Sequence, residues 1–292
     1  MELRHIRYFL AVAGEKNFTR AAVMVGIGQS PLSQQIKDLE REVGASLFRR
    51  VPQGAELTEA GEAFLKVVRA FPPLVARATH AAQRAARGET GSLNVGFTAS
   101  SAFNAVVPGA IRAFRTAYPD VLLTLEEANT TRLVEGLRDG VLDAVFLRPG
   151  SAGLDAFQLR PLSEEAMVLA LPASHPAVSS DEIDLADVAN DPLLLFPRDV
   201  GPTLYDTIVD AFRTAGLEPQ LGQTAPQIAS VVNLVAAALG ISMVPASMSQ
   251  LAVAGVVYRP IKGKAPIARI ALAIRRGETG AIVRNFVARA IA

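Results

Sequence analysis

The sequence predicts a two-part α/β protein, with a small helical N-terminal domain followed by a larger domain of alternating strands and helices. The chain has 292 residues, which is enough for roughly two domains with their own cores. Apolar residues repeat at the helical period up to about residue 88, and strand-like and helical segments alternate from residue 90 onward. Residues 1–88 carry 13 basic and 8 acidic side chains, against 16 and 20 in the remainder. This asymmetry favours an N-terminal nucleic-acid-binding module, with chance scatter of charge as the alternative.

Composition limits the chemistry that the chain can perform. The sequence has no Cys, which excludes disulfides, thiolate nucleophiles and Cys-ligated metals. Its three histidines, His5, His80 and His175, lie far apart, with no carboxylate at the spacing of a metal ligand set. The sequence shows no pattern typical of a catalytic triad. We therefore expect a protein that is not an enzyme and that needs no metal or cofactor.

The sequence has no segment typical of secretion or of a membrane span. The longest apolar run, residues 231–245, is interrupted by Asn233, Gly240 and Ser242. It is shorter than the roughly 20 apolar residues that span a bilayer. Residues 1–5 lack the apolar core of a signal peptide. We expect a cytoplasmic protein without a membrane partner.

The N-terminal segment has the pattern of a helix–turn–helix. Apolar residues at the helical period predict an opening helix. Asn17 or Thr19 fits the N-cap of a short second helix over residues 20–25. Ser30 and Pro31 fit the N-cap and the first position of a third helix. Two short helices around a tight turn favour DNA binding through the third helix.

The outer face of this third helix is polar and basic. Gln29, Ser33 and Gln34 are the candidate readers of base edges, because hydroxyl and amide groups can both donate to and accept from bases. Lys37 and Arg41 lie one turn apart and suit phosphates, which set affinity and register. On periodicity alone, an ordinary solvated helix face is the alternative.

A wing and a long helix are predicted to follow. Residues 47–58 have the pattern of a two-stranded β-ribbon with a turn around residues 52–54, which would place Arg49 and Arg50 against the DNA backbone. From there to about residue 87, apolar residues repeat at close to 3.5 residues, the seam of a coiled-coil-like pairing between two copies. Pro72-Pro73 should kink this helix near its middle. Two separate helices packed on their own domain are the alternative.

Taken together, these stretches resemble the LysR-type transcriptional regulators. The stretches that carry the resemblance are Leu3-Arg4-His5-Ile6-Arg7-Tyr8-Phe9, Phe18-Thr19-Arg20-Ala21-Ala22, Gln29-Ser30-Pro31-Leu32-Ser33-Gln34-Gln35-Ile36, Leu39-Glu40, Gly44, Leu47-Phe48-Arg49-Arg50 and Leu57-Thr58-Glu59-Ala60-Gly61. Residues 85–96 resemble the family's junction with its effector domain, so that the match covers the whole chain. Gly28 and Ser30 depart from the family pattern, in which Ser and Pro are usual at these positions.

The resemblance implies a domain order and a set of partners. It implies a winged helix-turn-helix DNA-binding domain over residues 1–58, a linker (dimerisation) helix over 59–88 and a periplasmic-binding-protein-like (type 2) effector-binding domain over 89–292. It further implies a homodimer or homotetramer on double-stranded promoter DNA, and a small inducer that changes the contact with RNA polymerase. The candidate DNA-binding residues are Arg20, Gln29, Ser30, Pro31, Ser33, Gln34, Lys37, Arg49, Arg50 and Gln53.

In the second part of the chain, the alternation of segments predicts parallel sheets covered on both faces. The strand-like segments are residues 93–97, 122–125, 143–147, 167–171, 193–196, 241–245 and 267–274, and the helical ones are 105–118, 132–139, 203–215, 227–239 and 280–291. The resemblance implies two subdomains around a cleft. Subdomain I would comprise about residues 89–161 and 266–292, and subdomain II about residues 162–265.

Side chains that suit an anionic ligand follow several of these strands. Ligands of open α/β sheets bind at the carboxyl ends of strands, against helix N-termini. Ser100 and Ser101 follow the first strand, Thr130 follows the second and Arg148 follows the third. Arg provides a planar, bidentate donor for a carboxylate. For each residue alone, a helix cap or a solvated Arg is the alternative.

Within the family, the chain is most similar to muconate- and benzoate-responsive regulators of aromatic catabolism. This narrower resemblance rests on Glu2-Leu3-Arg4-His5, Leu194-Leu195-Phe196-Pro197 and Val244-Pro245-Ala246-Ser247. It implies an effector site at Ser100, Ser101, Thr130, Arg148, Thr203, Leu204 and Ile228, and Arg160 matches a second effector site. The expected function is a promoter-binding regulator induced by a muconate-like or aromatic carboxylate. A LysR-type regulator that senses a non-aromatic metabolite, a solute-binding protein and an enzyme on a similar fold are the alternatives.

Overall fold

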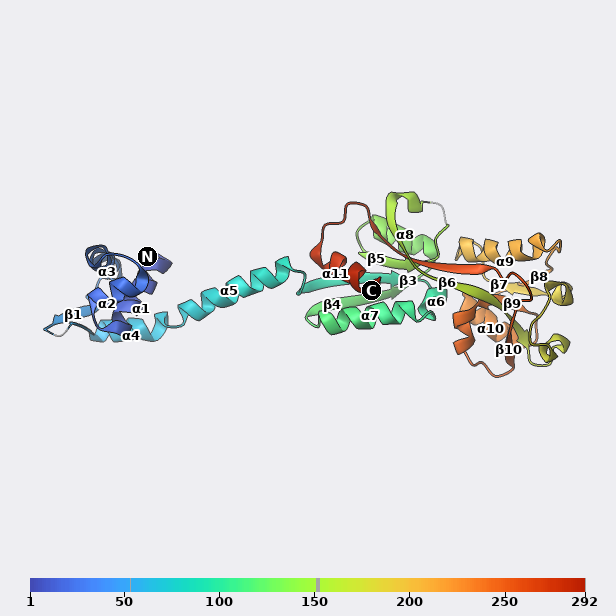
Figure 1. Ribbon diagram of the computed structural model, residues 1–292, viewed down its shortest axis with the longest axis horizontal. Coiled ribbons are helices and arrows are strands. Elements are labelled where there is room, and N and C mark those ends of the chain that lie inside the picture. The colour runs from blue at the N-terminus through green and yellow to red at the C-terminus, as the bar shows by residue number, and fades with distance from the viewer. Residues whose placement is uncertain (53, 151–152, 292) are drawn as a thin grey trace. The chain divides into compact units, whose positions relative to one another are not determined.

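The chain folds into two compact units, Met1–Gln83 and Arg84–Ala292 (Figure 1). The computed structural model describes residues 1–52, 54–150 and 153–291. In this described part of the chain, no helix has the length and the apolar run that a membrane crossing needs.

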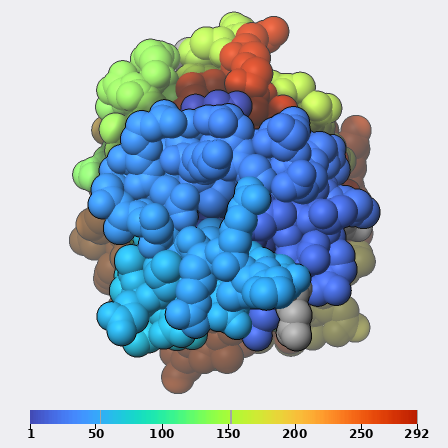
Figure 2. All heavy atoms as spheres, turned by 90° about the vertical axis from the view of Figure 1, so that its left-hand side faces the viewer, coloured from blue at the N-terminus to red at the C-terminus, as the bar shows by residue number. Residues whose placement is uncertain are grey.

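The N-terminal unit is a helix–turn–helix with a two-stranded wing. Its elements are α1 (Leu3–Glu15), α2 (Phe18–Val25), α3 (Gln29–Val43), β1 (Phe48–Val51), β2 (Gly54–Leu57), α4 (Glu59–Val68) and the start of α5 (Phe71–Ala86). The ring of Phe9 lies at the centre of its core, 5.1 Å from the Phe48 ring and 4.9 Å from the Phe64 ring between centroids. Figure 2 shows the surface of this unit, with the wing in light blue.

Helix α2 begins at Phe18 rather than at residue 20, with Asn17, one of its two predicted caps, as the N-cap, and the start of α3 also differs from the prediction. The Asn17 side chain accepts from the Thr19 and Arg20 N–H groups at 2.9 and 3.0 Å and caps α2 as predicted. Helix α3 begins earlier than predicted, with Gly28 as N-cap, so the assignment of Ser30 and Pro31 to the N-cap and first position is wrong. Proline is tolerated anywhere in a first helical turn, because the N–H groups there have no intrahelical acceptor. A Cβ at Gly28 would lie 3.2 Å from the Pro31 ring, so glycine leaves room for this arrangement.

The predicted long linker helix is interrupted rather than kinked. Helix α4 ends at Val68 and α5 begins at Phe71, with a turn at residues 69–70. Pro72 and Pro73 lack the N–H groups that would donate to the Val68 and Arg69 carbonyls and continue α4. No described side chain of α5 is buried in the single chain.

The second unit consists of two α/β subdomains. The first contains β3 (Gly91–Phe97), α6 (Ala99–Ala102), α7 (Val106–Ala117), β4 (Val121–Glu127), α8 (Thr130–Arg138), β5 (Ala144–Leu147), η1 (Leu154–Ala156) and α11 (Ala281–Ala290). The second contains η2 (Pro176–Ser179), η3 (Leu185–Val188), β7 (Leu193–Leu195), α9 (Pro202–Thr214), β8 (Leu221–Thr224), α10 (Ile228–Ala236), β9 (Ser242–Pro245), η4 (Ala246–Gln250) and β10 (Val256–Pro260). Two long strands, β6 (Phe157–Pro172) and β11 (Ile267–Arg275), run between them.

The main sheet is mixed, which corrects the prediction of parallel sheets. Its order is β10-β6-β11-β5-β3-β4, with β9 also paired to β6. Strand β3 is parallel to β4 and β5, whereas β11 is antiparallel to both β5 and β6. The chain leaves the first subdomain along β6 and returns along β11, so these neighbours must run in opposite directions. Their register shifts between Ile270, opposite Ser163, and Ala271, opposite Pro161, which leaves Leu162 without a partner.

Helices cover both faces of the first subdomain's sheet, as the sequence predicted. Helices α7 and α11 pack on one face, where the Phe114 and Phe286 rings lie 5.3 Å apart. Helix α8 packs on the other face through Leu133 and Leu137. The second subdomain has a separate core that includes Phe212 of α9 and Val231 of α10. The predicted fold class, an N-terminal winged helix–turn–helix with a two-subdomain α/β domain, is confirmed.

Candidate DNA-binding surface and effector pocket

The exposed face of α3 carries most of the side chains predicted to contact bases. Gln29, Ser30, Pro31 and Gln34 are exposed, and Ser33 is half-buried. The Gln29 Nε2 donates to Ser33 Oγ at 3.1 Å, so these two polar groups lie together on one face of the helix. Amide and hydroxyl groups placed side by side at a helix N-terminus are suited to base edges in a major groove.

Some of the basic side chains predicted to contact DNA already form an ion pair with a carboxylate, and others do not. Arg20 and Arg49 are each paired with a glutamate, at N–O distances of 3.2 and 2.7 Å. Lys37 and Arg50 are exposed and form no ion pair with the described residues. The predicted contact Gln53 lies outside the described residues.

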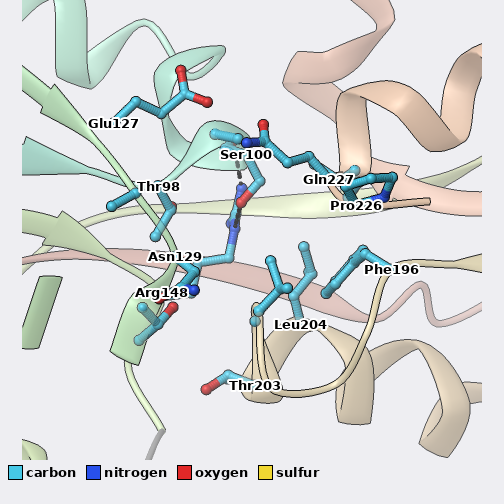
Figure 3. Close-up of a pocket in the computed structure, with 16 residues that line it drawn as sticks. Thr98, Ser100, Glu127, Asn129, Arg148, Phe196, Thr203, Leu204, Pro226 and Gln227 are labelled. Atoms are coloured by element: carbon cyan, nitrogen blue, oxygen red, sulfur yellow. Dashed lines mark hydrogen bonds between the residues drawn. The ribbon is translucent and has the colours of Figure 1, made fainter. Parts of the chain in front are cut away.

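A pocket of about 160 Å³ lies between the two subdomains of the second unit (Figure 3). On one side it is lined by the ends of β3, β4 and β5 and the start of α8. On the other side it is lined by the segment after β7 and the starts of α9 and α10. The lining residues are Thr98, Ala99, Ser100, Glu127, Ala128, Asn129, Thr130, Arg148, Phe196, Val200, Gly201, Thr203, Leu204, Pro226, Gln227 and Ile228. Helix N-termini leave backbone N–H groups without intrahelical acceptors, so they favour polar or anionic ligand groups.

The first subdomain contributes hydroxyl groups to this pocket, and the second contributes apolar side chains together with Thr203 and Gln227. The hydroxyl side chains of Thr98, Ser100 and Thr130 come from the first subdomain. The Thr98 Oγ1 is buried and has no hydrogen-bond partner among the described residues. Phe196 and Leu204 contribute an apolar wall from the second subdomain. The pocket therefore suits a small ligand with oxygen at one end and hydrocarbon at the other.

Arg148 lies at the polar end, but its guanidinium is already engaged by the protein. Nε donates to Ser100 Oγ at 2.9 Å, and Nη2 donates to the Ser100 carbonyl at 3.0 Å (Figure 3). Nη2 also donates to Glu165 Oε1 at 3.4 Å. Nη1 donates to the Arg269 carbonyl at 3.5 Å. Burial lowers the pKa of the Arg148 guanidinium, and the nearby Glu165 carboxylate opposes this shift. A side chain held in this way is not a free bidentate fork for a ligand carboxylate.

Glu165 extends this network into the second subdomain. Its Oε2 accepts from the Ser247 N–H at 2.8 Å, while its Oε1 faces Arg148. The Thr130 N–H donates to the Val200 carbonyl at 3.3 Å, so the cleft is also bridged beside the pocket. These contacts join the two subdomains around the polar end of the pocket.

The structure brings together six of the seven residues predicted for the effector site. Ser101 is the exception, because its hydroxyl is buried and donates to the Thr98 carbonyl at 2.8 Å outside the pocket lining. Arg160, predicted for a second site, is exposed on β6 and does not line this pocket. The candidate site residues had omitted Phe196, Gln227 and the other lining residues that follow β4, β7 and β8. The available signal was that Phe196 ends a predicted strand and that Gln227 begins a predicted helix.

Comparison with protein families assigns both units. Residues 3–62 match the bacterial regulatory helix-turn-helix protein model of the lysR family, and residues 86–292 match the LysR substrate binding domain model. This chain belongs to the LysR-type transcriptional regulators. The general resemblance found in the sequence is thereby confirmed.

Several relatives of this LysR-type regulator match along its length. The HTH-type transcriptional regulator BudR of Raoultella terrigena is 39% identical over 98% of this chain and 99% of its own. AlsR of Bacillus subtilis is 35% identical over 98% of this chain and 94% of its own. The crystal structure of CbnR, a LysR family transcriptional regulator, superposes with a TM-score of 0.84 at 29% identity and covers 99% of this chain and 100% of its own. A structure of full-length CbnR with its target DNA also matches, with a TM-score of 0.82.

These relatives establish the general function and not the inducer. They are transcriptional regulators, and the chain is accordingly a LysR-type DNA-binding regulator. The narrower resemblance to regulators of aromatic catabolism is not confirmed, and neither BudR nor AlsR is named for an aromatic compound.

Proposed function

We propose that this LysR-type regulator responds to a small, non-aromatic, oxygen-bearing metabolite with at most one negative charge, bound in the pocket between the subdomains. The observation that carries the proposal is the engagement of Arg148 by Ser100 and Glu165. A dianion such as muconate needs cationic partners, and the one cationic side chain in the described lining is already paired. Glu127 adds a further negative charge to the lining.

The hydroxyl groups give the ligand its binding partners. Because Ser100 Oγ accepts from Arg148 Nε at 2.9 Å, its own hydrogen remains for an acceptor in the pocket. The buried Thr98 Oγ1 has no hydrogen-bond partner among the described residues, and a ligand oxygen would provide one. A carbonyl, a hydroxyl or a single carboxylate satisfies both groups.

Cavity size sets an upper limit to the ligand. The volume of about 160 Å³ is close to that of an engineered cavity of roughly 150 Å³ that holds benzene. Size therefore admits ligands of a few carbons and does not by itself exclude a single ring. The chain is 39% identical to BudR and 35% identical to AlsR, and this similarity supports a non-aromatic ligand.

We further propose that the regulator acts as a homodimer, or as a tetramer built from dimers, on promoter DNA and in contact with RNA polymerase. An apolar groove of about 580 Å³ on the N-terminal unit supports this proposal, since Leu3, Leu10, Met24, Phe71 and Val75 line it. Leu74 on α5 is also exposed. Apolar side chains of this kind on a long helix are typical of pairing with a second copy.

The proposed ligand class is tested by calorimetry and thermal unfolding of the full chain with a panel of compounds. The panel contains short hydroxy-ketones, diols, aliphatic monocarboxylates, muconate, benzoate and salicylate. A ligand at one hundred times its dissociation constant should stabilise the folded chain by about 2.7 kcal/mol. We expect binding among the first three classes, and binding of muconate or of the aromatic acids alone would contradict the proposal.

Two neighbouring serines provide a matched pair of variants. Ser100→Ala should weaken ligand binding about tenfold, because it removes the hydroxyl group that faces the ligand. Ser101→Ala should leave affinity unchanged, since the Ser101 hydroxyl donates to the Thr98 carbonyl away from the pocket. Equal losses in the two variants would show that the ligand does not bind at Ser100.

A further inference from the structure

The two arginines of the wing lie on opposite faces of β1. Arg49 pairs with Glu56 across the ribbon, whereas Arg50 lies opposite Ala55. Arg49 donates from Nε and Nη2 to Glu56 Oε2 at 3.0 and 2.7 Å. Side chains alternate between the two faces of a strand, so Arg50 shares its face with Phe48. Adjacent positions in the sequence therefore have different electrostatic surroundings.

Arg50 lies beside the recognition helix. A hollow of about 70 Å³ is lined by Arg50 and Phe48 from the wing and by Ser33, Lys37 and Glu40 from α3, together with Phe18 and Ile36. Arg50 and Lys37 are both exposed, and neither forms an ion pair with a described residue. Two cations without ion pairs on neighbouring elements are suited to phosphate groups, and the one carboxylate in the described lining of the hollow, Glu40, accepts from backbone N–H groups instead.

Glu40 connects the wing to α3 by binding backbone rather than a basic side chain. Its Oε1 accepts from the Leu47 N–H at 2.7 Å and from the Phe48 N–H at 3.1 Å. The Phe48 ring packs between Phe9 and Phe18, with centroid distances of 5.1 and 5.9 Å. Backbone and ring contacts together fix the position of Phe48, the first residue of β1, and the direction of its side chain.

The second strand of the wing is attached to the same unit by backbone contacts. The Ala55 N–H donates to the Lys16 carbonyl at 2.9 Å. A Cβ at Gly54 would lie 2.2 Å from that carbonyl oxygen, which explains the glycine at this close approach. With both strands attached, the wing is a fixed part of the DNA-binding unit rather than a free hairpin.

We propose that Glu40 is a positioning residue that holds Arg50 beside Lys37, and that these two cations bind the DNA backbone together while Arg49, paired with Glu56, contributes little. The proposal rests on DNA binding through the helix–turn–helix, which is a property of the family. It assigns different roles to two arginines that the sequence placed in one group. The partner group is a phosphate of double-stranded DNA.

The test measures binding of the full chain to a duplex that the wild-type chain has selected from a random library, over a series of salt concentrations. Each phosphate contact contributes about 0.9 to the slope of log K against log salt. Arg50→Ala and Lys37→Ala should each lower this slope by about one and weaken binding about tenfold. Arg49→Ala with Glu56→Ala, which removes the whole pair and keeps the net charge, should leave the slope within error of wild type. A slope change as large as that of Arg50→Ala would overturn the proposed division of roles.

The role of Glu40 is tested by a double-mutant cycle. Glu40→Ala removes the acceptor for two backbone N–H groups, so Arg50→Ala should have little further effect on affinity or slope in that background. Glu40→Gln keeps a carbonyl acceptor at the same place and should restore most of the salt slope. Additive effects of Glu40→Ala and Arg50→Ala, in a chain whose unfolding shows the N-terminal unit intact, would overturn the positioning role. If Glu40→Ala unfolds that unit, Glu40→Gln takes its place in the cycle, and a loss of slope in Glu40→Gln that adds in full to that of Arg50→Ala would overturn the positioning role.

Discussion

The DNA-binding unit and the effector pocket each place an arginine near a glutamate, and the two regions use the glutamate differently. In the pocket, Glu165 faces the guanidinium of Arg148 at 3.4 Å. In the wing, Glu40 accepts from the backbone N–H groups of Leu47 and Phe48, and Arg50 forms no ion pair with a described residue. A buried arginine is costly unless a carboxylate compensates it, whereas an exposed one needs no such partner. We infer from this difference that Arg148 stabilises the fold, whereas Arg50 is available to a phosphate of DNA.

The largest expected effect separates these two arginines by their contribution to stability. Arg148→Ala should destabilise the effector unit by about 3 kcal/mol, because it leaves the nearly buried Glu165 carboxylate without its cationic partner. Arg50→Ala should change stability by less than about 0.5 kcal/mol, since its side chain is exposed and unpaired. Urea unfolding, followed by probes in each unit, measures both values.

A double variant serves as the control for Arg148. Arg148→Met with Glu165→Leu removes both charges and should recover much of the stability that Arg148→Ala loses. If Arg148→Ala instead has the same free energy of unfolding as wild type, Arg148 does not have the structural role that distinguishes it here from Arg50.

The next effect concerns the backbone contacts that attach the wing. Gly61 of α4 lies against the start of the wing, and a Cβ there would be 2.1 Å from the Leu47 carbonyl oxygen. Because a backbone atom cannot move aside cheaply, Gly61→Ala should destabilise the N-terminal unit by about 2 kcal/mol. Gly14→Ala is the matched control, since a Cβ at this helical position meets nothing within 4 Å. It should stabilise the unit by about 0.5 kcal/mol through helix propensity. Thermal unfolding of the two variants should therefore shift in opposite directions, and a common direction would contradict this account of the wing.

The smallest expected effect on stability comes from Glu278, whose carboxylate accepts from both a backbone N–H and an arginine. Burial raises the pKa of its carboxyl, but hydrogen bonds from the Gly280 N–H at 2.8 Å and from Arg275 at 2.9 Å outweigh this, so the pKa lies below its ordinary value. As pH falls, the unfolded chain takes up the proton first, at the ordinary pKa. The contribution of this carboxylate is therefore complete above the ordinary pKa and is lost as pH falls through the lowered one.

The contribution of Glu278 is measured by comparing the stability of wild type and Glu278→Gln as a function of pH. The stability difference between wild type and the variant should be present at neutral pH and should shrink in the acid range. A difference that stays constant with pH would show that the amide replaces the carboxylate fully, and that charge has no part in this contact.

The sequence predicted the N-terminal unit well because its signals are local. The Asn17 cap and the turn of the wing depend on residues a few positions apart. The start of α3 was missed because it depends on the fit between Gly28 and Pro31. In the effector domain, apolar runs predicted the buried strands, but the first half of β6 is partly polar and exposed and was missed. The antiparallel direction of β11 depends on the return of the chain from the second subdomain, which spacing does not show.

The candidate site was predicted in position but not in detail. Strand ends located Ser100, Thr130 and Arg148. Their roles depend on contacts that the folded chain makes. Glu165 reaches Arg148 from β6, and the Ser101 hydroxyl donates to the Thr98 carbonyl. A sequence pattern indicates which side chains reach a pocket, whereas the hydrogen bonds of the folded chain decide which of them are free for a ligand.

The antiparallel pair β6 and β11 has a mechanical consequence for a regulator of this kind. Hydrogen bonds along the pair, from Phe157 opposite Arg275 to Ala166 opposite Ile267, hold together the two strands that connect the subdomains. The irregularity at Leu162 adds local twist without breaking either strand. We expect relative motion of the subdomains to occur mainly as bending of this strand pair. Such bending would convert the size of whatever fills the pocket into an angle.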